Sequence, residues 1–206
     1  SSLDEKTRGK VVYFSVKEEV NGAYVSEGKI FYKGKYVADL SDLPISGIHN
    51  VYDALACLCV AIIMGVDKND VVEAFKNFKG VKHRIQFVRQ VNGVDFYNDS
   101  KATNVDATVK AVAAMSKPTI LILGGKDKGL DFTPLFEGIK GSKVKAIVAT
   151  GESAFRIAEC AKKCEFGEVS MTGDFNLAFY LAKKMAERGD AVLLSPACSS
   201  FDAFTD

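Results

Sequence analysis

The clearest fold signal in the sequence is the stretch Thr119-Ile120-Leu121-Ile122-Leu123, which runs directly into Gly124-Gly125-Lys126-Asp127-Lys128-Gly129. A short, continuous apolar run is typical of a strand that is buried on both faces. Strands of this kind occur in parallel sheets that helices cover on both sides. The stretch therefore predicts an α/β domain.

Predicted strands and predicted helices alternate along the chain on both sides of this strand. The apolar patterns predict extended segments at 86–91, 94–97, 144–150, around Val169 and at 191–194, and helices at 106–115, 153–163 and 175–188. Alternation of strands and helices predicts a sheet with crossover helices. We predict a Rossmann-like α/β domain over residues 81–206.

The first 80 residues have a different pattern. Between residues 10 and 40, β-branched and aromatic runs are separated by Asn21-Gly22 and Lys33-Gly34, which predicts a small antiparallel meander. Apolar residues then recur at helical spacing from Asn50, and a second helix is expected at 68–78 with Asp67 as its N-cap. Gly80 is expected to end this unit, so the predicted domains are 1–80 and 81–206.

Charge and apolar run length exclude several classes of protein. The chain has 27 Lys and Arg against 26 Asp and Glu, so it lacks the basic excess of a nucleic-acid-binding surface. Its apolar stretches are far shorter than the roughly 20 residues that span a bilayer, and its first ten residues contain no apolar signal core. We therefore expect a cytoplasmic protein with no nucleic-acid or membrane partner. The 5 cysteines lack the paired spacing of a zinc site, and no metal site is expected in this chain.

Three loops that follow predicted strands carry the candidate functional residues, since ligands bind such sheets at the carboxyl ends of the strands. The first loop is Asn98-Asp99-Ser100-Lys101-Ala102-Thr103-Asn104. A helix cap would explain one or two of these polar residues, but Lys101 has no capping role. We expect this loop to be functional.

The second loop begins at Gly124 and continues to Asp131. Paired glycines permit close backbone approach, and Lys126 and Lys128 could hold an anion. The loop matches neither the Walker phosphate loop nor the dinucleotide fingerprint. A solvated turn with two ordinary lysines is an equally good interpretation.

The third loop is Ser195-Pro196-Ala197-Cys198-Ser199-Ser200-Phe201-Asp202. Its hydroxyls and backbone N–H groups suit a carboxylate, although a capping turn would look similar. Cys198 is a poor candidate nucleophile because no histidine lies near it in sequence. Outside these loops, Arg84 offers a cationic fork for phosphate, and Asn50 has the donor and acceptor pair that an adenine edge requires. The two histidines are expected to be structural hydrogen-bonding groups.

Five motifs carry a resemblance to a known family: Gly47-Ile48-His49-Asn50, His83-Arg84-Ile85-Gln86, the 98–104 loop, Gly124-Gly125-Lys126-Asp127-Lys128-Gly129 and the 195–202 loop. In order and spacing they resemble the motifs of the Mur ligases, and within that family those of the branch that adds D-glutamate.

The resemblance implies an activity: ATP- and Mg²⁺-dependent joining of D-glutamate to UDP-N-acetylmuramoyl-L-alanine in peptidoglycan synthesis. In this family the carboxylate is phosphorylated, the amine attacks the acyl phosphate, and a tetrahedral intermediate expels phosphate. On the matching positions, Lys101 would lie near the transferred phosphate as the catalytic residue. The nucleotide would be bound by Asn50, Asp53, Arg84 and Asp99, and D-glutamate by Thr103, Lys128, Ser200 and the backbone of Phe201. Asp53 stands where the family usually has a second asparagine.

The family's phosphate loop, magnesium-binding glutamate and carbamylated lysine lie upstream of these motifs. We therefore expect residues 1–80 to be the C-terminal part of a central ATPase domain, and 81–206 to be a slightly truncated amino-acid-binding domain. The chain alone is expected to be monomeric and inactive, with magnesium and the nucleotide sugar held by parts of the ligase outside it. Two alternatives stay open: a ligase resembling folylpolyglutamate synthase, and a non-catalytic α/β binding module.

Overall fold

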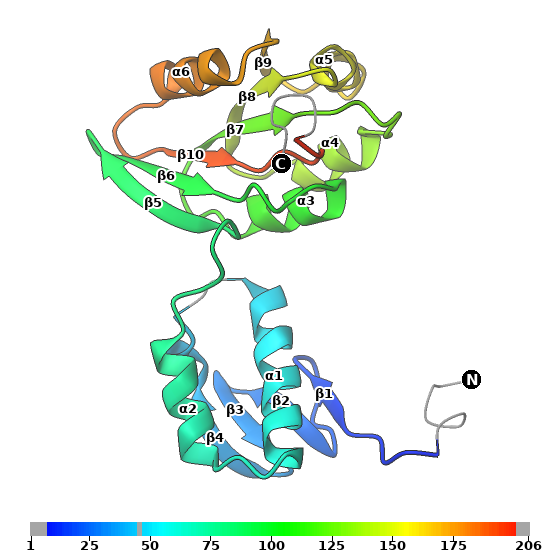
Figure 1. The fold of residues 1–206 in the computed structure, drawn as a ribbon, viewed down its shortest axis with the longest axis vertical. Coiled ribbons are helices and arrows are strands. Elements are labelled where there is room, and N and C mark those ends of the chain that lie inside the picture. The colour runs from blue at the N-terminus through cyan, green and yellow to red at the C-terminus, as the bar shows by residue number, and fades with distance from the viewer. Residues whose placement is uncertain (1–7, 45–46, 201–206) are drawn as a thin grey trace. The chain divides into compact units, whose positions relative to one another are not determined.

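The computed structural model describes residues 8–44 and 47–200, which fall into two compact units (Figure 1). The first unit ends at Gly80 and the second begins at Val81. The first contains β1 (Tyr13–Ser15), β2 (Gly22–Ser26), β3 (Lys29–Tyr32), β4 (Lys35–Asp39), the 3-10 helix η2 (Leu40–Asp42), α1 (Ile48–Ile63) and α2 (Lys68–Asn77). The second contains β5 (Gln86–Val91), β6 (Val94–Asn98), α3 (Val105–Ala113), β7 (Thr119–Gly124), α4 (Thr133–Ile139), β8 (Val144–Thr150), α5 (Ala154–Lys163), β9 (Glu168–Thr172), α6 (Phe175–Met185) and β10 (Ala191–Leu194).

The meander of the first unit is antiparallel for β2, β3 and β4, as predicted, but β1 pairs parallel with β2, so the prediction of a hairpin at Asn21-Gly22 is wrong. The chain reverses twice between the two strands. The Ser15 hydroxyl accepts from the backbone N–H groups of Lys17 and Glu18, at 3.1 and 3.2 Å, and the N–H of Gly22 then donates to the carbonyl of Val20 at 2.8 Å. Two reversals restore the original direction, which is why the strands run parallel.

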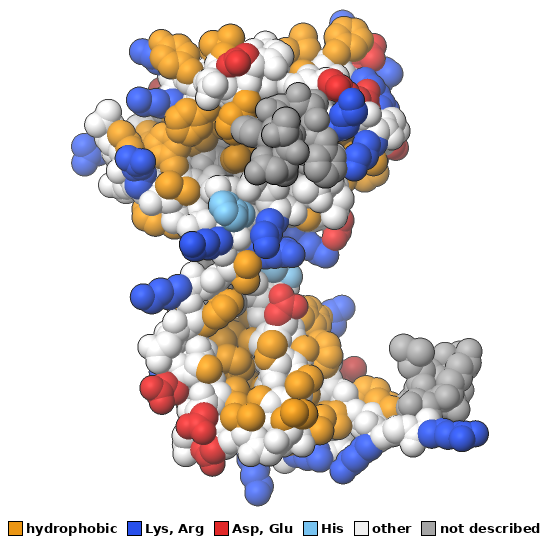
Figure 2. All heavy atoms as spheres, in the orientation of Figure 1, with side chains coloured by type: hydrophobic (Ala, Val, Ile, Leu, Met, Phe, Trp, Pro, Cys, Tyr) orange, Lys and Arg blue, Asp and Glu red, His pale blue; other side chains and the backbone are white. Residues whose placement is uncertain are grey.

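Helices α1 and α2 contribute to the core of the first unit. Leu55 and Leu58 of α1 and Val71 of α2 join Ile30 and Val37 of the sheet in one buried cluster. The predicted N-cap of α2 is confirmed, since Asp67 accepts from the N–H of Asn69 at 2.8 Å. Hydrophobic side chains also reach the surface along α1 (Figure 2). Val60, Ile63 and Met64 are exposed at its C-terminal end.

The second unit is built on a six-stranded sheet with the order β5-β6-β10-β7-β8-β9. Five strands are parallel, as predicted, and every residue of β7 is buried. The edge strand β5 is an exception, because it pairs antiparallel with β6. Asn92 and Gly93 join the two strands with φ values of 52° and 80°, the left-handed conformation of a tight hairpin turn.

The predicted helices of this unit are present with small shifts at their ends. Asn104 caps α3 by accepting from the N–H of Ala107 at 2.8 Å. Helix α6 ends at Met185, three residues before the predicted end at Arg188. Helix α4 was not predicted, because it is short and contains Pro134 and Gly138. A Cβ on Gly138 would lie 2.8 Å from Val109 of α3, so glycine permits these helices to pack closely.

Alternate residues of the parallel strands enter two hydrophobic clusters, one on each face of the sheet. Leu121, Leu123 and Leu193 pack with α3, α4 and α5, whereas Ile120 and Ile122 pack with α6. This arrangement explains the continuous apolar pattern of β7, because both of its faces are covered. None of the helices in the described residues is long and apolar enough to cross a membrane.

Candidate functional site at the carboxyl edge of the sheet

The parallel strands of the second unit end at one edge, where the three predicted loops meet. Backbone hydrogen bonds join the loops to one another: Asp99 N donates to Leu194 O at 2.8 Å, Gly124 N to Pro196 O at 2.8 Å, Lys126 N to Ser199 O at 2.8 Å and Ala197 N to Ala102 O at 2.9 Å. The sequence prediction that these segments lie together is confirmed. The loops form one hydrogen-bonded layer over the strand ends.

The paired glycines of the second loop serve contacts within the protein. A Cβ on Gly124 would lie 1.9 Å from the carbonyl oxygen of Thr150, and one on Gly125 would lie 2.3 Å from that of Ser199. Their φ values, 120° and 140°, also disfavour larger residues. Glycine is therefore required here for the strand ends to approach one another.

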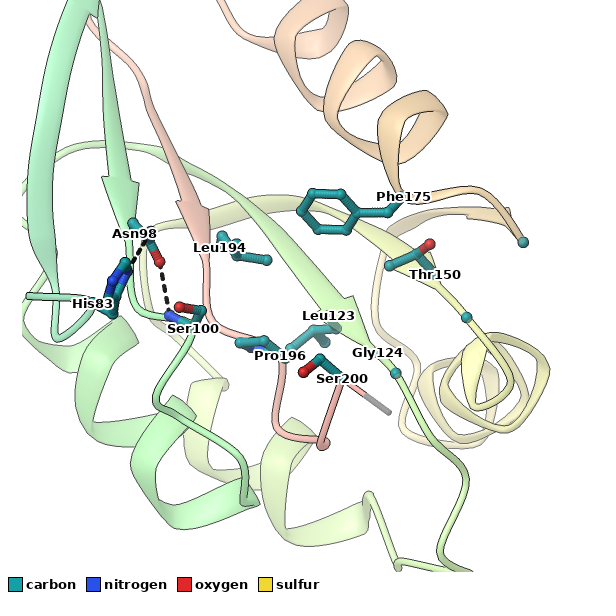
Figure 3. A pocket seen from close by; sticks show the side chains of 13 residues that line it. His83, Asn98, Ser100, Leu123, Gly124, Thr150, Phe175, Leu194, Pro196 and Ser200 are labelled. Atoms are coloured by element: carbon teal, nitrogen blue, oxygen red, sulfur yellow. Dashed lines mark hydrogen bonds between the residues drawn. The ribbon is translucent and has the colours of Figure 1, made fainter. Parts of the chain in front are cut away.

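A cavity of about 370 Å³ opens at this edge (Figure 3). Its lining residues come from the ends of β6, β7, β8 and β10, from the segment before β5 and from the start of α6. They are His83, Asn98, Ser100, Leu123, Gly124, Gly125, Thr150, Gly151, Gly173, Phe175, Leu194, Pro196 and Ser200. Leucine, phenylalanine and proline form apolar walls, while hydroxyl, amide and imidazole groups supply polar contacts. Such a mixed surface suits a small polar ligand.

Asp99 connects the first loop to two other segments. Its carboxylate accepts from the N–H of Ile85 at 3.1 Å and from the hydroxyl of Ser195 at 2.7 Å. The residue is only 5% exposed. The carboxylate therefore orders this edge, whatever else it binds.

A second connection runs through His83, which has a φ of 67°. Asn98 accepts from the N–H of Ser100 at 3.0 Å through Oδ1, which leaves its Nδ2 to donate to Nδ1 of His83 at 3.0 Å (Figure 3). The carbonyl of His83 accepts from the N–H of Lys101 at 3.2 Å. This histidine makes hydrogen bonds within the protein, as expected, and it also lines the cavity. Its exclusion as a ligand-binding residue stays a prediction.

The two lysines of the second loop differ in their surroundings. Nζ of Lys126 lies 2.7 Å from Oε1 of Glu152, and this contact lowers the pKa of the Glu152 carboxyl from its ordinary value. Lys128 is exposed at the tip of the same loop, directly after Asp127. The side chain of Asp127 accepts from the N–H of Gly129 at 2.9 Å and so forms a tight turn around Lys128.

Arg156 of α5 binds this turn from both sides. Its guanidinium donates to Oδ1 of Asp127 at 2.6 Å and to the carbonyl oxygen of Leu130 at 2.7 Å. The pKa of the Asp127 carboxyl lies below its ordinary value because the Gly129 N–H and, after it, the Arg156 guanidinium favour the charged form. The sequence analysis did not single out Arg156 or Glu152, since Arg156 lies within the helix predicted at 153–163 and Glu152 directly precedes it. Their signal in the sequence is a pair of opposite charges four residues apart, after a predicted strand.

The remaining predicted site residues are distributed as follows. Arg84, Lys101, Thr103 and Ser200 are exposed in the second unit, and Ser200 lines the cavity. Asn50 and Asp53 lie in the first part of α1, in the other unit, where Asn50 is half-buried and Asp53 is exposed. Phe201 lies outside the described residues. Cys198 is 2% exposed, with its Sγ 3.5 Å from Oγ of Ser153, and is therefore not an accessible nucleophile.

Residues 8–44 and 47–200 contain no group of three His, Cys, Asp or Glu side chains that could hold a metal ion. The ammonium groups of Lys101, Lys126 and Lys128 and the hydroxyls of Ser100 and Ser200 lie on the loops at this edge. Such donors suit carboxylate or phosphate groups.

The sequence is similar to curated ligases over nearly its whole length. It is 43% identical over 205 residues to UDP-N-acetylmuramoylalanine--D-glutamate ligase of Streptococcus suis, covering 99% of this chain and 45% of that protein. It is 40% identical over 204 residues to the ligase of the same name from Latilactobacillus sakei, covering 98% of this chain and 45% of that protein. The chain thus spans slightly less than half the length of these relatives.

Solved structures show the same fold. UDP-N-acetylmuramate-alanine ligase of Thermotoga maritima matches with a TM-score of 0.65 at 19% identity, over 90% of this chain and 44% of that one. A murein peptide ligase of Psychrobacter arcticus matches with a TM-score of 0.61 at 16% identity, over 91% and 43%.

The fold and the edge define a Rossmann-like α/β domain in which three loops converge at the carboxyl ends of the parallel strands. The family model for the glutamate ligase domain of Mur ligases matches residues 83–198. The chain belongs to the Mur ligase family, as the resemblance of its motifs implied.

Proposed function

We propose that the protein containing this chain joins D-glutamate to UDP-N-acetylmuramoyl-L-alanine at the expense of ATP, in peptidoglycan synthesis. The observation that carries the proposal is the identity of 40–43% to D-glutamate ligases over nearly all of this chain. The convergence of the 98–104, 124–131 and 195–200 loops at one sheet edge supports it.

In this proposal the second unit binds the amino acid. D-glutamate carries two carboxylates, which require cations and hydroxyl or N–H donors. Lys128, Thr103, Ser200 and the backbone of Phe201 would supply them. The ammonium of Lys101 would stabilise negative charge on the transferred phosphoryl group, which makes it the proposed catalytic residue.

The nucleotide would be bound by residues of both units. Arg84 offers its guanidinium to phosphate, Asn50 its amide to adenine, and Asp53 adds an acceptor. Asp99 would act mainly by ordering the edge, since its carboxylate accepts from Ile85 and Ser195. Magnesium, which neutralises phosphate charge when bound, would be held by parts of the ligase outside this chain.

The first unit would be part of a larger ATPase domain. The exposed apolar residues Val60, Ile63 and Met64 at the end of α1 support this assignment, because large exposed apolar patches commonly mark contact surfaces. The proposal further includes a cytoplasmic, monomeric enzyme without nucleic-acid or membrane partners.

Phosphate release by the full-length gene product tests the proposed activity. We expect release from ATP only when D-glutamate and UDP-N-acetylmuramoyl-L-alanine are both present, with L-glutamate as the matched control. Release that depends on a pteroate compound would favour the folylpolyglutamate synthase alternative. No release with any acceptor would favour a binding module.

A pair of lysine variants tests the assignment of the amino-acid site. Lys128→Ala should raise the KM for D-glutamate roughly 10- to 100-fold, the range for a lost charged hydrogen bond. Lys126→Ala should change it less than about threefold, because Lys126 pairs with Glu152 at an exposed site. Equal effects of the two variants would contradict the assignment.

A further inference from the structure

The turn that carries Lys128 is open to solvent. Gly129 has a φ of 72°, and a Cβ placed on it would meet no atom within 4 Å. A glycine-containing, solvent-exposed turn loses much conformational freedom when it is ordered. A contact from a neighbouring element can therefore stabilise one conformation of this turn.

Arg156 supplies this contact through two hydrogen bonds from its guanidinium. One nitrogen, Nη1, donates to the side chain of Asp127, and the other, Nη2, donates to the backbone of Leu130. These two residues lie on either side of Lys128 in the chain. The planar guanidinium consequently fixes the separation between the two ends of the Lys128 turn.

The anchor of this contact is rigid. Arg156 lies on α5, whose neighbouring residue Ile157 is fully buried in the core beneath the loops. Glu152, which directly precedes α5, pairs with Lys126. Two side chains from residues 152–156 therefore contact the second loop. Residues on a packed helix position a site more reproducibly than residues on a loop.

We propose that Arg156 is a positioning residue for amino-acid binding: it holds the 126–131 loop so that Lys128 presents its ammonium to a carboxylate of the substrate. This inference rests on the proposed function. It assigns a role in the same site to a residue on a different element. Arg156 does not itself contact the substrate in this scheme, because its guanidinium donates to Asp127 and Leu130.

The test measures steady-state kinetics of Arg156→Gln in the full-length gene product. We expect the KM for D-glutamate to rise about tenfold while kcat at saturating D-glutamate stays within about threefold, since misplacing a binding group weakens binding first. The KM for ATP should not change. Arg156→Lys, which keeps the charge but not the fork, should give an intermediate KM. Lys162→Gln removes an exposed charge from the same helix and is the matched control.

A double-mutant cycle separates positioning from direct contact. If Arg156 acts through the turn, Asp127→Asn should also raise the KM for D-glutamate, and the double variant should be no worse than the more affected single variant. Independent, multiplicative effects of the two changes would overturn the proposal, as would an Arg156→Gln protein with a lowered Tm but an unchanged KM.

Amide hydrogen exchange makes the outcome independent of the enzyme assay. Exchange at Gly129, whose N–H donates to Asp127, should accelerate in Arg156→Gln, while exchange at Lys126, whose N–H donates to Ser199, should not. If the wild-type protein fails to couple D-glutamate, the proposed function fails, whereas unchanged exchange at Gly129 would refute the role of Arg156 alone.

Discussion

Replacing Asp99 by alanine should destabilise the second unit substantially. The carboxylate is 5% exposed and accepts hydrogen bonds from the N–H of Ile85 and the hydroxyl of Ser195. Alanine leaves both donors without this acceptor. The Ser195 hydroxyl can turn to Oγ1 of Thr108, 3.1 Å away, but the N–H of Ile85 loses its acceptor. An unsatisfied buried donor costs about 1–3 kcal/mol, and loss of the Ser195 bond to the carboxylate adds about 1 kcal/mol, so the free energy of unfolding should fall by about 2–4 kcal/mol.

Variants of the hydrogen-bond partner Ser195 test whether the loss comes from the bonds of the Asp99 carboxylate. Ser195→Ala removes one of the two donors and should cost about 1–2 kcal/mol. The double variant should cost about 1 kcal/mol less than the sum of the single variants, because both changes remove the same hydrogen bond. Asp106→Ala, which loses an exposed pair with Lys110 and a carboxylate in the first turn of α3, should cost less than about 1 kcal/mol.

Hydrogen exchange measured by mass spectrometry is the appropriate assay, because it reports each unit separately. Amides of β7 and β10 lie in the buried sheet, and their slowest exchange reflects opening of the whole second unit. A loss below about 1 kcal/mol for Asp99→Ala, or strict additivity with Ser195→Ala, would show that the carboxylate does not hold the edge together.

Two further predictions concern charge and backbone. The pKa of Asp95 lies below its ordinary value because Lys117 and then Gln90 bond its carboxylate, so this pair stabilises the fold above about pH 4 and loses its effect as pH falls through the lowered pKa. Lys117→Met should therefore cost about 1 kcal/mol at about pH 7 and much less at about pH 2, as measured by urea unfolding; an equal cost at both pH values would contradict this. Gly125→Ala should cost about 3 kcal/mol or more, from its left-handed φ and its contact with a carbonyl, whereas Gly129→Ala should cost about 1 kcal/mol from φ alone. Thermal unfolding of the two variants compares these costs, and similar Tm values would refute the steric argument.

Much of the second unit could be predicted because its signals are local. The apolar run at 120–123 identified a buried strand, and the parallel arrangement brought the predicted loops to one edge as expected. Helix α4 escaped prediction because seven residues with a proline and a glycine carry too little helical periodicity. The antiparallel pairing expected for β1 was wrong because the chain already turns once after Ser15, so the turn at Asn21-Gly22 is a second reversal and restores the original direction.

The candidate site was only partly predictable from sequence because some of its contacts join residues that are far apart in the chain. Lys128 and Lys126 look alike in sequence, and only the fold shows that Glu152 pairs with Lys126. Arg156 lies 26 residues from its acceptor Leu130, a contact that no local pattern reveals. The catalytic and binding roles assigned to all of the site residues stay predictions.

The position of β10 has a consequence for how the second unit folds. This strand is inserted between β6 and β7, although it follows them in the chain by more than one helix and strand. During synthesis, β6 and β7 therefore have no common neighbour until residues 191–194 leave the ribosome, and pairing over such long separations is slow. The 195–200 loop is translated immediately afterwards, so the candidate binding edge is among the last parts of this unit to assemble.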